Sequence, residues 1–112
     1  MKKYDDKGNL IYASGKGWKV WYDYDAKGNL IHLKWSDGIE HWYDTKGNLI
    51  HSKWSDGIER WCDYDINGNL IHEKWSNGIE HWYNAKGNLI HSKWSNGDEY
   101  WYDDNGNVVR KI

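Results

Sequence analysis

The chain has 112 residues, the size of one ordinary domain, with ten Trp, nine Tyr, no Phe and a net charge of −2. Acidic and basic residues alternate along it, so it lacks the basic stripe that neutralises phosphates, and we exclude nucleic acid as a partner. Lys2 and Lys3 are followed by Tyr4 and Asp5 instead of an apolar stretch, and there is no long apolar run, so we expect neither a signal peptide nor membrane insertion.

The sequence is a tandem repeat. Gly-Asn pairs recur at spacings of 20, 19, 21, 19 and 19 residues. Their glycines are Gly8, Gly28, Gly47, Gly68, Gly87 and Gly106. Residues 22–61 match residues 62–101 at 30 of 40 positions, which also fits an engineered consensus protein. We predict a single repeat domain over residues 1–112, in which 22–61 and 62–101 are paired repeats.

The two ends differ from the middle. In residues 1–21, a Ser-Gly-Lys-Gly segment replaces the Trp-Ser-Asp-Gly turn of the other copies. In residues 102–112, a Val-Val-Arg-Lys segment replaces Leu-Ile-His-x-Lys. Since an exposed sheet edge invites further strand pairing, we interpret these segments as an N-terminal capping repeat and a C-terminal half-repeat cap.

Every repeat of the middle contains two turn signals separated by short runs rich in Ile, Tyr and Trp, a pattern typical of strands. Residues 44–47, Asp-Thr-Lys-Gly, predict a type I turn closed by a left-handed Gly. Four other dipeptides predict tight type I′ hairpins, namely Asp37-Gly38, Asp56-Gly57, Asn77-Gly78 and Asn96-Gly97. We therefore predict an all-β fold of tandem β-hairpins without helices, an up-and-down antiparallel meander that forms a spiral or a stacked sheet.

Two strand registers fit the repeat. In the first, the Asp-x-x-Gly loop has three residues and the Asp-Gly loop two. Tyr43 then lies opposite Leu49, and His41 lies opposite His51. This register places the Trp and Tyr rows on opposite faces of the sheet.

In the second register each loop is one residue longer. Trp54 then lies opposite Ile58, and Lys53 lies opposite Glu59 as a favourable cross-strand charge pair. This register places Ile, the first Trp and Tyr of each repeat on one face. In both registers both faces carry aromatic rings.

Residues 22–30, Tyr-Asp-Tyr-Asp-Ala-Lys-Gly-Asn-Leu, and residues 63–70, Asp-Tyr-Asp-Ile-Asn-Gly-Asn-Leu, resemble the YD repeats of Rhs-type bacterial surface and toxin proteins. The resemblance extends over nearly the whole chain. It implies a spiralling antiparallel sheet that serves as a shell or scaffold without chemistry of its own, on the bacterial surface or secreted. This chain departs from that family in its high Trp content, and it is too short to enclose a cargo.

The spacing of Trp35, Trp42-Tyr43 and Gly47, repeated at Trp54 and Trp61, is similar to the choline-binding and glucan-binding repeats of bacterial cell-wall proteins. That resemblance implies a ligand held among aromatic rings. The position after Trp42-Tyr43 is an Asp, so the three-ring box for a quaternary ammonium is incomplete.

The repeated tryptophans are the main candidate binding residues, because indole faces stack on sugar rings and hold cations. The candidates are Trp35, Trp42, Trp54, Trp61, Trp75, Trp82, Trp94 and Trp101. The alternative is that they form the core of a protein that lacks Phe. A repeated array of weak sites favours a polymeric partner, since linked sites gain from effective concentration. A polysaccharide is therefore one candidate partner, and self-association is the other.

The histidines are a lesser candidate. The first register pairs His41 with His51 and His81 with His91, and two imidazoles across a strand pair could bind a divalent metal. The alternative is ordinary surface histidines that titrate near pH 6.5.

The spacing gives no support to catalysis, because near-identical repeats multiply positions instead of building one asymmetric site. We predict no cofactor. The leading hypothesis is a non-enzymatic repeat scaffold or self-associating module. A carbohydrate-binding or cell-wall-binding module is the alternative, and metal binding is a distant third.

Overall fold

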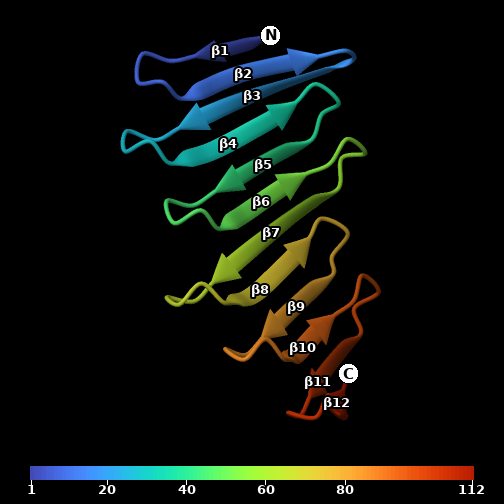
Figure 1. Ribbon diagram of the computed structural model, residues 1–112. Coiled ribbons are helices and arrows are strands. Elements are labelled where there is room, and N and C mark those ends of the chain that lie inside the picture. The colour runs from blue at the N-terminus through green and yellow to red at the C-terminus, as the bar shows by residue number, and fades with distance from the viewer. The chain divides into compact units, whose positions relative to one another are not determined.

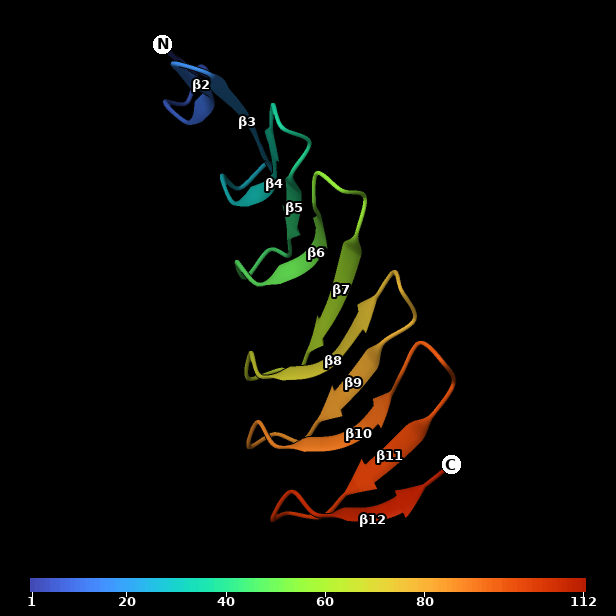
Figure 2. The ribbon, with the colours of Figure 1, turned by 90° about the vertical axis from the view of Figure 1, so that its right-hand side faces the viewer.

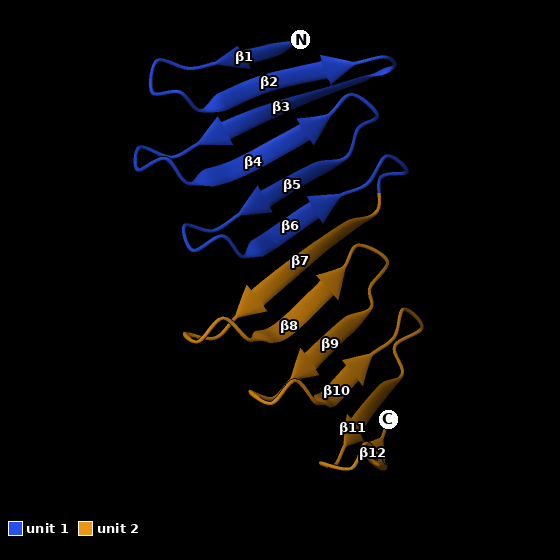
Figure 3. Ribbon diagram, viewed as in Figure 1, with its two compact units in different colours: residues 1–57 blue, residues 58–112 orange.

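The computed structural model describes residues 1–112 as an all-β protein of twelve antiparallel strands, whose order in the sheet follows the order in the chain (Figure 1). The predicted meander of tandem hairpins is thus confirmed, and the chain contains no helix. No helical segment with the length and apolar character to cross a membrane is present. The chain divides into two compact units, Met1–Gly57 and Ile58–Ile112 (Figure 3).

The first unit contains the strands β1 (Lys2–Tyr4), β2 (Leu10–Gly15), β3 (Trp18–Tyr24), β4 (Leu30–Trp35), β5 (Glu40–Tyr43) and β6 (Leu49–Lys53). The second unit contains β7 (Glu59–Tyr64), β8 (Leu70–Trp75), β9 (Glu80–Tyr83), β10 (Leu89–Lys93), β11 (Glu99–Tyr102) and β12 (Val108–Lys111). Within each unit a strand contacts only its neighbours in sequence, so each unit is a single layer of sheet (Figure 2).

Both kinds of loop have the same construction, a three-residue hairpin loop closed by a left-handed Gly. In the Asp-x-x-Gly loop the Gly47 amide donates to the Asp44 carbonyl at 3.1 Å, and Gly47 has a φ of 88°, as predicted. In the Asp-Gly loop the Gly38 amide donates to the Trp35 carbonyl at 3.0 Å. The predicted type I′ turn is wrong, because it requires positive φ at both central residues, and no residue other than Gly has positive φ.

The observed register combines one half of each alternative. Tyr43 pairs with Leu49 as in the first register, and Lys34 pairs with Glu40 at a position equivalent to the Lys-Glu pair of the second. Beyond Leu49 the pairing shifts at a β-bulge. The extra residue, Ile50, brings His51 opposite Trp42.

Side chains alternate between two faces along each strand. We call the first the ladder face; it carries His32, Trp42 and His51 in the first unit and His72, Trp82, His91 and Trp101 in the second. The opposite tyrosine face carries Tyr24 and Tyr43 in the first unit and Tyr83 and Tyr102 in the second. The buried side chains all lie on the tyrosine face and are Ala13, Val20, Ser52, Cys62, Glu73 and Ser92.

The core is therefore thin. Only three apolar side chains are fully buried, Ala13, Val20 and Cys62, so most of the apolar area removed from water belongs to half-buried aromatic rings. Cross-strand contacts among partly exposed rings, carboxylates and hydroxyls replace a core of fully buried side chains.

Candidate functional site

The structure divides the candidate tryptophans between the two faces. Trp42, Trp61, Trp82 and Trp101 lie on the ladder face in the middle of strands. Trp35, Trp54, Trp75 and Trp94 lie on the tyrosine face at the Asp-Gly hairpin ends. All eight keep some solvent exposure, and Trp61 and Trp94 are each 40% exposed. Within each unit they therefore lie on two opposite faces, and their role as ligand platforms stays a prediction.

In the second unit the ladder face is a continuous stack of rings. His72 stacks on Trp82 with ring centroids 5.0 Å apart, and Trp82 stacks on His91 at 4.2 Å. His91 in turn stacks on Trp101 at 4.4 Å with an interplanar angle of 11°. Arg110 ends the stack, its guanidinium 4.7 Å from the Trp101 ring centroid. The stack therefore runs across the strands from β8 to β12 and adds contacts between side chains to the backbone pairing of the sheet.

The first unit repeats this stack with His32, Trp42 and His51, whose successive ring centroids are 5.0 and 4.3 Å apart. Both ring nitrogens of His32 meet carboxylates. Nδ1 lies 2.8 Å from Asp23 Oδ2, and Nε2 lies 2.8 Å from Glu40 Oε2. His32 is thus fixed by stacking on its face and by polar contacts at its edge.

His72 has the same surroundings in the second unit, where Nδ1 lies 2.9 Å from Asp63 and Nε2 lies 2.9 Å from Glu80. Ionised carboxylates only accept hydrogen bonds, so an imidazole that donates to both must carry both protons. Burial opposes that charge, but the bonds to Asp63 and Glu80 outweigh it and raise the pKa of His72. Protonated His72 is therefore an imidazolium stacked against the Trp82 indole, an arrangement that stabilises the cation.

The predicted histidine pairs are wrong in register. The bulge brings His41 opposite Ser52, with Nδ1 2.8 Å from the Ser52 hydroxyl, while His51 faces the other side of the sheet. His81 and His91 are separated in the same way. No group of three or more His, Cys, Asp or Glu side chains has the geometry of a metal site. The bulge was not predicted, although two adjacent apolar residues mark its place in each copy, Leu-Ile in most copies and Val-Val in the last.

One polar network on the tyrosine face has no counterpart in the predictions. The Arg60 Nε donates to Glu73 Oε2 at 2.7 Å, and the Tyr83 hydroxyl donates to Glu73 Oε1 at 3.0 Å. Glu73 is only 8% exposed. Burial, together with the bond to Glu73, raises the pKa of Tyr83 to about 12. Arg60 also lies over the Trp75 ring at 5.5 Å, so the guanidinium is fixed on two sides.

The thiol beside this network is inert as a nucleophile. Cys62 is buried and unpaired, and burial raises the pKa of its thiol. A reactive cysteine needs the opposite shift, since the thiolate is the nucleophile.

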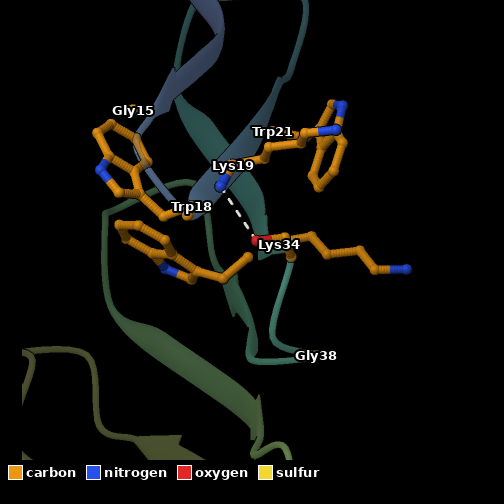
Figure 4. A pocket seen from close by; sticks show the side chains of 9 residues that line it. Gly15, Trp18, Lys19, Trp21, Lys34 and Gly38 are labelled. Atoms are coloured by element: carbon orange, nitrogen blue, oxygen red, sulfur yellow. Dashed lines mark hydrogen bonds between the residues drawn. The ribbon is translucent and has the colours of Figure 1, made fainter.

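An aromatic pocket of about 570 Å³ lies in the first unit around Trp18 and Trp35. The two indoles lie 6.1 Å apart at an angle of 53°. Trp18 lies over Gly15, where a Cβ would overlap the indole. Figure 4 shows Trp18 on one side of the strands and Trp21 and Lys34 on the other. Trp18 was not among the predicted residues, because it stands in the divergent first repeat; a Trp facing a Gly across a short turn was the available signal.

The fold and the aromatic rings on its two faces define a tandem-repeat antiparallel β protein. No protein-family model matches the chain, and no curated protein matches it. Among solved structures it is similar to a chain in a crystal structure of TcdB2–TccC3–Cdc42, with 18% identity and a TM-score of 0.48 over 99% of this chain and 7% of that one. It is also similar to a chain of the Photorhabdus luminescens Tc holotoxin pore with a mutated TccC3, with 19% identity and a TM-score of 0.46 over 99% of this chain and 6% of that one. The chain thus spans less than a tenth of either.

Proposed function

We propose that the chain is a non-enzymatic repeat scaffold of the YD type, which displays a regular single-layer sheet. The observation that carries this proposal is that the repeated side chains hold the sheet together. The ladder-face rings stack on one another, and the turn carboxylates bind the backbone of their own loops, as Asp44 does with the amides of Lys46 and Asn48. Residues occupied in this way build the repeat and leave no group poised for chemistry.

An insertion tests the scaffold. Stability in a repeat protein is close to a sum of unit and nearest-neighbour terms, so a further copy of residues 62–101 placed after Trp101 should fold and raise the free energy of unfolding. Urea unfolding followed by circular dichroism measures this. A copy that lowers the stability of the chain, or fails to fold, would contradict the proposal.

A carbohydrate-binding function is the second candidate, and the pocket at Trp18 and Trp35 favours it. Trp18 is 43% exposed, and exposed indoles set at an angle offer stacking faces to a sugar ring. The lining contains no carboxylate, which favours a neutral sugar over a choline-like cation.

Titration of Trp fluorescence with β-glucan, chitin, peptidoglycan, a uronic acid polymer and choline separates the two candidates. A saturable shift that disappears in a Trp18→Ala variant but persists in Trp94→Ala would establish a glycan site at the pocket. If no ligand gives a saturable shift, carbohydrate binding is contradicted and the scaffold is the remaining candidate function. Trp94 is a matched control because it has a similar exposure, 40%, at another hairpin end.

A further inference from the structure

All charged side chains on the two outermost strands of the sheet, β1 and β12, are basic. Every residue of both strands is exposed. Lys2 and Lys3 lie on β1, and Arg110 and Lys111 lie on β12. A strand with an open edge is a template for pairing with another chain, so the residues there decide whether copies of this chain join.

Strand β1 is a copy of β11, the second strand of a repeat hairpin. Tyr4 pairs with Leu10 across a bulged register, as Tyr102 pairs with Val108. By this alignment Lys3 occupies the place of Trp101, and Lys2 occupies the place of Tyr100.

Strand β12 is a copy of β10, the first strand of the same hairpin. Arg110 pairs with Trp101, as His91 pairs with Trp82 one hairpin earlier. The Arg110 guanidinium also covers the Trp101 ring at 4.7 Å, where His91 covers the other face at 4.4 Å. Lys111 accordingly takes the place of Ser92.

Together, β12 of one copy and β1 of another contain the two strands of one repeat hairpin. Inside the chain that strand pair sets His91 against Trp101 and Ser92 against Tyr100. The same register between two copies would set Arg110 against Lys3 and Lys111 against Lys2. Like charges directly opposite one another destabilise an antiparallel pair.

The third position of this register would bring Ile112 opposite Met1, since Lys93 pairs with Glu99 inside the chain. The side chains of Ile112 and Met1 carry no charge, so the charge across this strand pair comes from the four basic side chains.

We propose that β12 and β1 form a strand-pairing surface for a second copy of this chain, matched in backbone register and blocked by like charge. Only four side chains, those of Lys2, Lys3, Arg110 and Lys111, oppose this pairing, because the backbone register of β12 and β1 would be that of β10 and β11 inside the chain. This inference is independent of the scaffold function and of glycan binding, since neither uses the open edges.

Reversing the charge on one edge tests the block. In a Lys2→Glu/Lys3→Glu variant the acidic β1 would face Arg110 and Lys111 of the next copy. Sedimentation velocity at low salt should show a weight-average mass at least twofold that of the 13.4-kDa chain, rising with protein concentration. Adding Arg110→Glu and Lys111→Glu to this variant restores like charge and should restore the monomer.

Two controls complete the experiment. A Lys27→Glu/Lys46→Glu variant makes the same change in net charge on exposed loops and should remain monomeric, as should the wild-type chain. The proposal is overturned if the β1 variant stays monomeric, if the loop variant associates as strongly, or if the wild-type chain already does. Should the β1 variant not fold, Arg110→Glu/Lys111→Glu carries the same expectation from the other edge, and its remaining monomeric would count against the proposal.

Discussion

The guanidinium of Arg60 binds the buried carboxylate of Glu73 at 2.7 Å, in a place where the equivalent strand pair of the first unit has two apolar side chains. By the alignment of the repeats, Val20 corresponds to Arg60, and Leu33 corresponds to Glu73. Both positions change together between the two copies: the apolar residues Val20 and Leu33 are replaced by the ion pair Arg60 and Glu73. Since the first unit forms the same sheet without the ion pair, the fold does not require it.

We therefore predict that both residues can be replaced together but not singly. Arg60→Val leaves Glu73 as an uncompensated carboxylate that is 8% exposed, and we expect a loss of about 3 kcal/mol in the free energy of unfolding. Arg60→Val/Glu73→Leu restores the composition of the first unit and should lie within about 1 kcal/mol of the wild type. Urea unfolding at neutral pH measures both.

The reciprocal exchange in the first unit is the matched control. Val20→Arg alone places an unpaired charge at a position that is 1% exposed, and it should be more destabilising than Val20→Arg/Leu33→Glu. Additive effects in both units would show that the two positions do not interact.

A second prediction concerns pH and His72. Its pKa is raised in the folded chain, so the stability it contributes is complete below the unfolded value of about 6.5 and is lost as the pH rises through the folded value. In Asp63→Asn/Glu80→Gln the ring keeps its stack on Trp82 but loses both carboxylates. The difference in stability between wild type and variant should shrink between about pH 6 and pH 8, and it should amount to less than about 1 kcal/mol because the site is partly solvated.

Thermal unfolding across that pH range measures the effect. A difference that is constant with pH would show that His72 is neutral in the folded chain. The variant Asp37→Asn serves as the control, since it removes a carboxylate from an exposed loop of the first unit.

The repeat period and the turn glycines were sufficient to predict the strands, their order and the Asp-x-x-Gly turn. Turn geometry is local, and a left-handed position such as Gly47 is visible in the sequence. The strand register could not be predicted from the sequence. Side chains alternate between the two faces of the sheet only while a strand contains no extra residue, and a bulge such as the one at Ile50 adds a residue.

The candidate residues show the same limit. A list of tryptophans could be made from the sequence, but their division between two faces depends on the bulge and the three-residue loops. The Arg60–Glu73–Tyr83 network joins three strands, and its members look like ordinary surface residues in the sequence. The only local sign was that Arg60 and Glu73 replace apolar residues of the other copy, whereas Tyr83 is a Tyr in both.

The third prediction concerns the acidic turns. Asp65 accepts hydrogen bonds from the amides of Asn67 and Asn69, and the bond from the Asn69 backbone is the largest factor that lowers its pKa. Its contribution to stability is therefore present above the unfolded value of about 3.9 and is lost as the pH falls through the folded value. Asp65→Asn should be less stable than wild type at neutral pH, and the difference should vanish in acid.

The chain contains a natural control for this exchange. Asn84 occupies the same turn position and accepts the amides of Lys86 and Asn88 at 3.0 Å without a charge. Asn84→Asp should gain stability at neutral pH and lose that gain in acid. Urea unfolding at about pH 7 and pH 3 compares the two variants, and a pH-independent difference would rule out the carboxylate as the cause.

The last prediction compares Gly15, which lies at the aromatic pocket, with Gly47, which closes an Asp-x-x-Gly turn. Gly15 does not have positive φ, but a Cβ there would overlap the Trp18 indole, so Gly15→Ala should displace the ring and increase quenching of Trp fluorescence by iodide. The side chain can move, so we expect a loss of only about 1 kcal/mol. Gly47→Ala meets no atom within 4 Å but has a φ of 88°, so it should cost about 1 kcal/mol and leave the quenching unchanged. If Gly15→Ala also leaves it unchanged, Trp18 does not lie over Gly15 in solution, and the pocket loses one of its two walls.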